Sequence, residues 1–138
     1  MSKNEVPIET VGRRFVEAFN RRDADALIAL ADPEIEFSPT SLVGARKVYR
    51  GHEGMRRWVS ELRQSAIEHQ VRVREVRALD AARFVILSEV LLGGETVSPS
   101  AMLARVSRDD LIVEAHSYLT DEQMLVQLGL LAEPVSRA

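Results

Sequence analysis

Apolar residues recur at helical spacing near the start of the chain. The pattern predicts a helix that ends near Asn20, and its apolar face consists of Val11, Phe15, Ala18 and Phe19. Asp23 has the side chain of an N-cap and predicts a second short helix, with an apolar side made of Leu27, Ile28 and Leu30. The Asp32-Pro33 pair should end this helix, because proline disfavours helical geometry in the residue before it.

The period of the pattern then shortens to two and lengthens again. Alternating apolar and polar residues predict a strand over 34–38, followed by a loop through Pro39, Gly44 and Tyr49. Gly51 and Gly54 mark the start of a third helix, whose buried stripe is expected to contain Met55, Trp58, Val59 and Leu62.

Beyond residue 67 the pattern is that of strands. Four are predicted, over 69–79, 83–92, 96–106 and 111–119, and their short connections imply an antiparallel meander. Pro99 should mark a bulge or an edge, because proline cannot donate a ladder hydrogen bond. A capping box over 120–123 and a C-cap glycine at Gly129 then predict a last helix.

The expected element order is α-α-β-α-β-β-β-β-α, which is typical of an α+β domain with a curved antiparallel sheet wrapped around helices. The strand over 83–92 is apolar on both of its alternating faces, so both sides of the sheet should be covered. One side can face the domain interior. The other can be a homodimer interface, which we expect, although a packed helix would cover it equally well.

The composition adds limits on partners and location. The 138 residues suffice for one domain, expected over 9–131, with a flexible arm over 1–8 and a tail over 132–138. A net charge of -3 does not favour nucleic acid as a partner, and no apolar stretch is long enough to cross a membrane. The absence of cysteine and of a signal-peptide pattern is consistent with a cytoplasmic protein.

Several segments carry a family resemblance. FVEAFNRRD (15–23) with ALIALADPEIEF (26–37), YRGHEGMRRW (49–58) and LIVEAHSYLTD (111–121) resemble the opening helices, the third-helix entry and the last strand of SnoaL-like proteins. The resemblance covers residues 9–131 and implies the cone-shaped nuclear transport factor 2-like fold. This family includes polyketide cyclases and relatives of ketosteroid isomerases and epoxide hydrolases, so the resemblance specifies the fold better than the function.

The resemblance also allows one family chemistry to be tested. Ketosteroid isomerases use a tyrosine and a carboxylate base. The corresponding positions here are Phe15 and Ser38, and neither residue can perform those roles. Conventional steroid isomerisation is therefore not expected.

Three other residues, His116, Tyr118 and Glu89, are candidates for acid/base catalysis. Glu114, His116 and Tyr118 project to one side of the last strand, where His116 can transfer a proton and Tyr118 can orient a substrate if that side faces the cavity. If it faces outward, they are surface or interface residues. Glu89 is a carboxylate in the most apolar strand, where burial would raise its pKa, and its alternative is a rim residue paired with arginine.

The expected function is binding of a small, largely apolar molecule in the interior of the cone, without a cofactor. The residues expected to contact it are Phe15, Phe37, Tyr49, Trp58 and Met102. His52 and His69 lack the spacing of metal ligands, so no metal is expected. The sequence leaves open whether the protein is an isomerase, cyclase or hydrolase using His116, Glu89 and Tyr118, or a non-catalytic binding or dimeric assembly module.

Overall fold

A computed structural model of the protein describes residues 7–39 and 47–133. The helices are α1 (Ile8–Asn20), α2 (Ala24–Ala29), α3 (Gly51–Gln64) and α4 (Glu122–Gln127). The strands are β1 (Ala31–Ser38), β2 (Tyr49–Arg50), β3 (His69–Ala78), β4 (Arg83–Leu92), β5 (Glu95–Val106) and β6 (Ile112–Tyr118). The α+β class is therefore confirmed, and the short strand β2 is the one element that the pattern did not predict.

The expected terminal segments lie mostly outside the described residues. The residues outside the description are 1–6 of the arm and 134–138 of the tail. In the loop expected after the first strand, residues 40–46 also lie outside it. Helix α1 begins at Ile8, inside the segment expected to be an arm.

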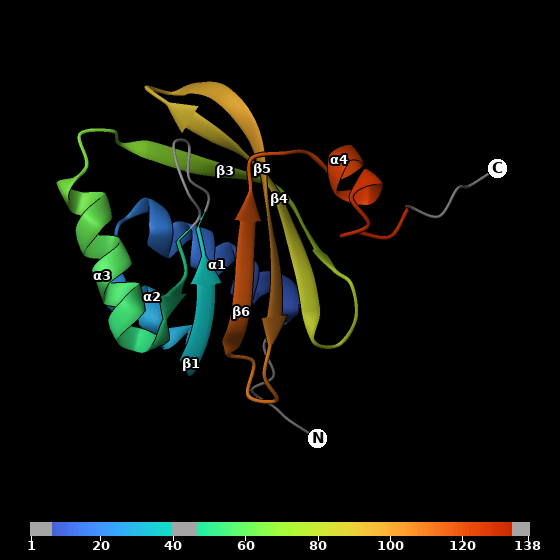
Figure 1. Ribbon diagram of the computed structural model, residues 1–138, viewed down its shortest axis with the longest axis horizontal. Coiled ribbons are helices and arrows are strands. Elements are labelled where there is room, and N and C mark those ends of the chain that lie inside the picture. Colours follow the sequence, from blue (N-terminus) through green and yellow to red (C-terminus); the bar gives the residue numbers. More distant parts are fainter. Residues whose placement is uncertain (1–6, 40–46, 134–138) are drawn as a thin grey trace.

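The strands form one six-stranded sheet in the order β2-β1-β6-β5-β4-β3. Strands β3 to β6 pair antiparallel in sequence order, which confirms the meander, whereas β1 pairs parallel with β6. The sheet curves, with α1 and α3 on one side and α4 on the other (Figure 1). This arrangement places β1 and β6, the first and last strands of the sequence, side by side in the interior of the sheet.

Strand β4 shows why both sides of the sheet are covered. Phe84 and Ile86 belong to the main core, together with residues of α1 and α3. Val85, between them, belongs to a second cluster with Leu125 of α4. Each of the three side chains is at most 2% exposed, so the expectation of two-sided burial is met, and a helix covers part of the second side.

Two prolines lie in the sheet where the strand pairing is irregular or one-sided. The Asp32-Pro33 pair was expected to precede the first strand, but β1 begins at Ala31 and includes both residues. The strand accommodates Pro33 because its pairing with β6 is irregular between Ala31 and Glu36. Pro99 pairs with β4, but β5 pairs with β6 only from Ala101 onward. Proline is tolerated at such edges and irregularities, as was expected for Pro99.

Aspartates cap both short helices. The Asp23 carboxylate accepts a hydrogen bond from the Ala26 amide at 3.1 Å, as expected. In α4 the capping residue is Asp121, which accepts from the Met124 amide at 3.0 Å, and not the first residue of the expected capping box, Thr120. A carboxylate in this position satisfies one of the free amides of the first turn.

Helix α1 approaches the sheet closely at Gly12. A Cβ atom added to this residue would lie 2.9 Å from Val76 Cγ1 and 3.1 Å from Phe84 Cε1. The absence of a side chain at Gly12 therefore determines how deeply α1 sits against β3 and β4.

Replacing Gly12 with alanine should lower the free energy of unfolding by about 1 to 3 kcal/mol, because the added methyl group overpacks the core. This is opposite to the usual gain of up to about 1 kcal/mol when alanine replaces glycine inside a helix. Urea unfolding measures the difference. Glu17→Ala, an exposed position on α1, serves as the control and should change the value by less than about 0.5 kcal/mol. A more stable Gly12→Ala variant would contradict the close approach.

Candidate functional site

An apolar pocket lies between the sheet and helices α1 and α3. It encloses about 100 Å³, and its aromatic wall consists of Phe15, Phe19, Phe37 and Trp58. The Trp58 ring contacts the other three, with centroids 4.4 Å from Phe37, 5.5 Å from Phe19 and 6.4 Å from Phe15. The remaining apolar lining comes from Val16, Pro39, Leu62, Val71, Ile86, Val90, Ala101 and Met102.

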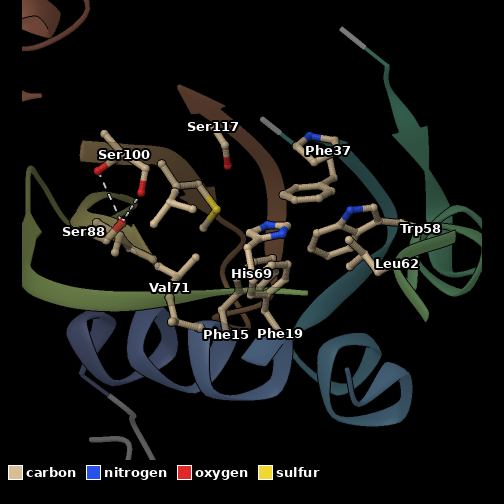
Figure 2. Close-up of a pocket in the computed structure, with 16 residues that line it drawn as sticks. Phe15, Phe19, Phe37, Trp58, Leu62, His69, Val71, Ser88, Ser100 and Ser117 are labelled. Carbon is tan, nitrogen blue, oxygen red and sulfur yellow. Dashed lines mark hydrogen bonds between the residues drawn. The ribbon is translucent and has the colours of Figure 1, made fainter. Parts of the chain in front are cut away.

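A few polar side chains also line the pocket. The Ser88 and Ser100 hydroxyl oxygens lie 2.8 Å apart on paired positions of β4 and β5, and Ser117 lies on β6. Figure 2 shows Ser88 and Ser100 at one end, Phe37 and Trp58 at the other, and His69 between them. The pocket therefore has a hydroxyl end and an aromatic end.

The His69 imidazole is held within the pocket by its neighbours. Its ring lies 5.3 Å from the Phe19 ring, and Arg22 donates a hydrogen bond to the His69 carbonyl at 2.8 Å. Burial, and to a smaller extent the positive charge of Arg22, lower the pKa of His69 below its ordinary value. The imidazole is thus neutral at neutral pH, so one of its ring nitrogens can donate a hydrogen bond and the other can accept one.

The end of helix α1 positions this part of the wall. The Asn20 side chain donates to the Val71 carbonyl at 2.8 Å and accepts from the Val71 amide at 2.9 Å. It therefore mimics a neighbouring strand beside β3, which is an edge strand of the sheet. Together with the Arg22 bond, this contact fixes His69 and Val71 relative to the aromatic wall.

Four of the five residues expected to contact a ligand line this pocket: Phe15, Phe37, Trp58 and Met102. Tyr49 lies elsewhere. It is buried, and its hydroxyl donates to the Glu61 carboxylate, so it joins β2 to α3. Burial and this carboxylate raise the pKa of Tyr49 to about 12, which keeps the phenol protonated.

The three residues expected to be catalytic lie on the opposite face of the sheet. Paired residues in neighbouring antiparallel strands share a face. The pairing of Ile86, Met102 and Ser117 defines the pocket face, and that of Val85, Leu103 and His116 defines the other, which we call the outer face. By the same alternation, Glu89 and Tyr118 lie on the outer face.

The contacts of Glu89, His116 and Tyr118 agree with the alternative in which they are surface, rim or interface residues. Arg72 binds the Glu89 carboxylate at 2.6 Å, and His116 Nε2 lies 3.2 Å from Glu114 Oε2. Tyr118 packs against the outer cluster that contains Leu125. A substrate inside the apolar pocket would not touch any of the three.

A second hollow of about 280 Å³ lies on the outer face beside α4. Its lining is mostly polar and consists of Arg74, Glu75, Leu87, Ser88, Pro99, Ser100, Asp121 and Glu122. The nearby Arg77 guanidinium bridges the carboxylates of Glu75 and Glu122, each at 2.8 Å. Small-molecule sites are usually apolar with a few convergent polar groups, so the apolar pocket is the stronger candidate.

The residues that sequence reasoning missed are His69, Ser88 and Ser100. The alternation along β4 places Ser88 and its neighbour Glu89 on opposite faces. On the pocket face of this strand, the Ser88 hydroxyl is the polar group among apolar side chains, and this was a signal in the sequence. For His69 the sequence holds no comparable signal, because the residue stands at the start of an edge strand, and its place in the wall depends on contacts with Phe19 and Arg22.

A model of the SnoaL-like domain matches residues 12–115, so the chain belongs to the SnoaL-like family. Its structure is similar to an NTF2-like protein of unknown function from Cytophaga hutchinsonii (15% identity, 90% of this chain and 98% of that chain covered, TM-score 0.62). It is also similar to a candidate polyketide cyclase from Sinorhizobium meliloti (18% identity, 86% of this chain and 100% of that chain covered, TM-score 0.63). A third similar structure is a computationally designed 17-OHP binder (13% identity, 83% of this chain and 92% of that chain covered, TM-score 0.65). These similarities show the nuclear transport factor 2-like fold.

No curated protein sequence matches the chain. Among the residues that the structure describes, no helix has both the length and the apolar character needed to cross a membrane.

The lowered pKa of His69 predicts a pH dependence of stability. Between the folded pKa and the unfolded value of about 6.5, the unfolded chain binds more protons than the folded one. The free energy of unfolding should therefore fall as the pH drops from 7.5 through this window. Urea unfolding at several pH values measures the slope. In His69→Phe the slope in this window should be smaller, and an unchanged slope would contradict the shift.

Proposed function

We propose that the protein binds a small, largely apolar molecule with one hydrogen-bonding group in the pocket between α1, α3 and the sheet. The observation that carries this proposal is the combination of a continuous aromatic wall with hydroxyl groups at the other end of the same space. The apolar part of a ligand would lie against Phe37 and Trp58. Its polar group would exchange hydrogen bonds with Ser88, Ser100 or His69.

The polar groups of the pocket suit a neutral ligand. Hydroxyls donate and accept hydrogen bonds, and a neutral imidazole does the same. Among the described residues that line the pocket, none is a carboxylate, a lysine or an arginine that would compensate a charged ligand. An alcohol, ketone or phenol fits these partners better than a carboxylic acid or an amine, because an unpaired charge is costly to bury.

The volume limits the part of the ligand that is enclosed. In an engineered protein interior, a cavity of roughly 150 Å³ holds one benzene molecule, whereas pockets for drug-sized ligands are about 300 to 1,000 Å³. The pocket, at about 100 Å³, is smaller than that cavity, so the part of a ligand that it encloses is at most one small ring or a branched chain. A longer ligand would extend from its opening.

Acid/base catalysis by His69 is the second candidate function. It is favoured by one observation: among the described residues that line the pocket, His69 is the only titratable one, and its lowered pKa leaves the imidazole free to accept a proton. In this alternative the hydroxyl groups would orient the substrate. Catalysis by Glu89, His116 or Tyr118 would instead require a substrate on the outer face. Homodimer formation and a cytoplasmic location stay predictions from the sequence.

Binding of 4-ethylphenol should shift the indole N–H resonance of Trp58 in a ¹H–¹⁵N spectrum. Because Trp58 is the single tryptophan of the chain, the signal needs no assignment. Val71→Phe places a ring in the pocket and should weaken binding at least about tenfold, since it removes the space for the ligand. Ethylbenzene, which lacks the hydroxyl group, should bind more weakly than 4-ethylphenol because it leaves the serine end unpaired.

Val73→Phe is the matched control. Val73 lies on the same strand, packs against the same core and does not line the pocket, so this variant should retain binding. Equal binding by the native protein and both variants would place the ligand elsewhere. A spectrum unchanged by either compound would argue against a site for small aromatic alcohols.

Proton transfer in the pocket can be tested with cyclopentanone in deuterium oxide. If His69 acts as a base, the protein should accelerate exchange of the α-protons, followed by NMR, and His69→Gln should slow it at least about tenfold. His52→Gln is the control, since the His52 ring bonds to the Ala31 carbonyl outside the pocket. Loss of exchange in His116→Gln with retention in His69→Gln would instead favour the outer-face residues.

A further inference from the structure

Three side chains with metal-binding atoms meet on the outer face, away from the pocket. Glu36 projects from β1, and Glu114 and His116 project from β6. Strands β1 and β6 are parallel neighbours in which Glu36 pairs with Glu114, and His116 follows two residues later on the same face. Two separate segments of the chain therefore contribute to one cluster.

The distances within this cluster suit a metal ion. One ligand atom from each of the three residues lies within 4.8 Å of the other two. The Glu114 Oε2 and His116 Nε2 atoms are 3.2 Å apart. Two ligands bound to zinc at about 2.0 to 2.1 Å with tetrahedral angles lie roughly 3.3 Å apart, so this pair already has the required spacing. Small rotations of the partly exposed Glu36 side chain would bring the third atom to a similar distance.

Arginines hold the two carboxylates in place. Arg50 binds Glu36, and Arg105 lies 3.5 Å from Glu114 Oε1. This oxygen is not the one that faces His116, so Glu114 can keep Arg105 while its other oxygen binds a metal. Both arginine side chains are more than half exposed, and such surface ion pairs are worth at most about 1 kcal/mol. A divalent ion can therefore compete with Arg50 for Glu36.

The mixture of ligands selects the class of ion. One imidazole and two carboxylates suit zinc and its neighbours among the divalent first-row transition ions. Calcium prefers six to eight oxygen ligands, and magnesium is bound chiefly through oxygen and water. We infer that Glu36, Glu114 and His116 form a binding site for a divalent transition-metal ion, with Zn²⁺ as its representative. Three protein ligands leave at least one coordination position for water or another ligand.

Substitution of any one of the three metal-ligating residues should weaken zinc binding. Isothermal titration of the untagged, chelator-treated protein with ZnCl₂ should give one ion per chain. Glu36→Gln, Glu114→Gln and His116→Gln should each weaken binding at least about tenfold, because each removes one ligand from the set. Zinc should also raise the thermal unfolding midpoint of the native protein more than that of the variants, since a ligand that binds only the folded state stabilises it.

Two matched controls separate the site from the general surface. His52→Gln removes an imidazole from α3, and Glu89→Gln removes a carboxylate from the outer face, so both should bind zinc as the native protein does. Circular dichroism verifies that every variant folds. The inference is overturned if zinc does not bind, if the three ligand variants bind as tightly as the native protein, or if Mg²⁺ binds as tightly as Zn²⁺.

Discussion

The hydrogen bonds between the end of helix α1 and the start of strand β3 support one wall of the pocket. The Asn20 side chain forms hydrogen bonds with both the carbonyl and the amide of Val71, and Arg22 donates a hydrogen bond to the His69 carbonyl. An edge strand has no second neighbour to fix its position, so these side chains supply what a further strand would supply elsewhere. The aromatic wall comes from α1, β1 and α3, and β3 carries the imidazole. The width of the pocket therefore depends on how α1 meets β3, and Gly12 allows the two to lie close together.

The alternation of side chains across the sheet divides the protein chemically. On the pocket face, hydroxyls, aliphatic chains and aromatic rings surround a neutral imidazole. On the outer face, Val85 packs against Leu125 of α4. Elsewhere on that face carboxylates and arginines compensate one another, and Glu36, Glu114 and His116 gather on β1 and β6. Neighbouring residues such as Ser117 and His116 thus belong to different environments. The pocket and the cluster of Glu36, Glu114 and His116 therefore lie on opposite faces of the same strands.

The sequence specified the fold better than the site. Helical spacing at Phe15 and Phe19 and the turns between the strands were sufficient for the order of the described elements except β2, because those signals are local. The alternation in β6 separated His116 from Ser117 but could not say which faced inward, since that choice depends on what packs against the sheet. The pairing of Glu36 with Glu114 joins distant segments in parallel and leaves no pattern in either segment alone. For the same reason, the position of His69 in the pocket could not be predicted.

The parallel pairing of β1 with β6 has a consequence for how the protein forms. Strand β1 ends at Ser38 and finds its parallel partner only at Ile112–Tyr118, so many residues separate the two. Contacts between distant segments slow folding, because the intervening chain must be ordered first. On the ribosome, the meander from β3 to β5 can begin to pair while β1 still lacks this neighbour. Closure of the sheet around the pocket is therefore a late event in the synthesis of the chain.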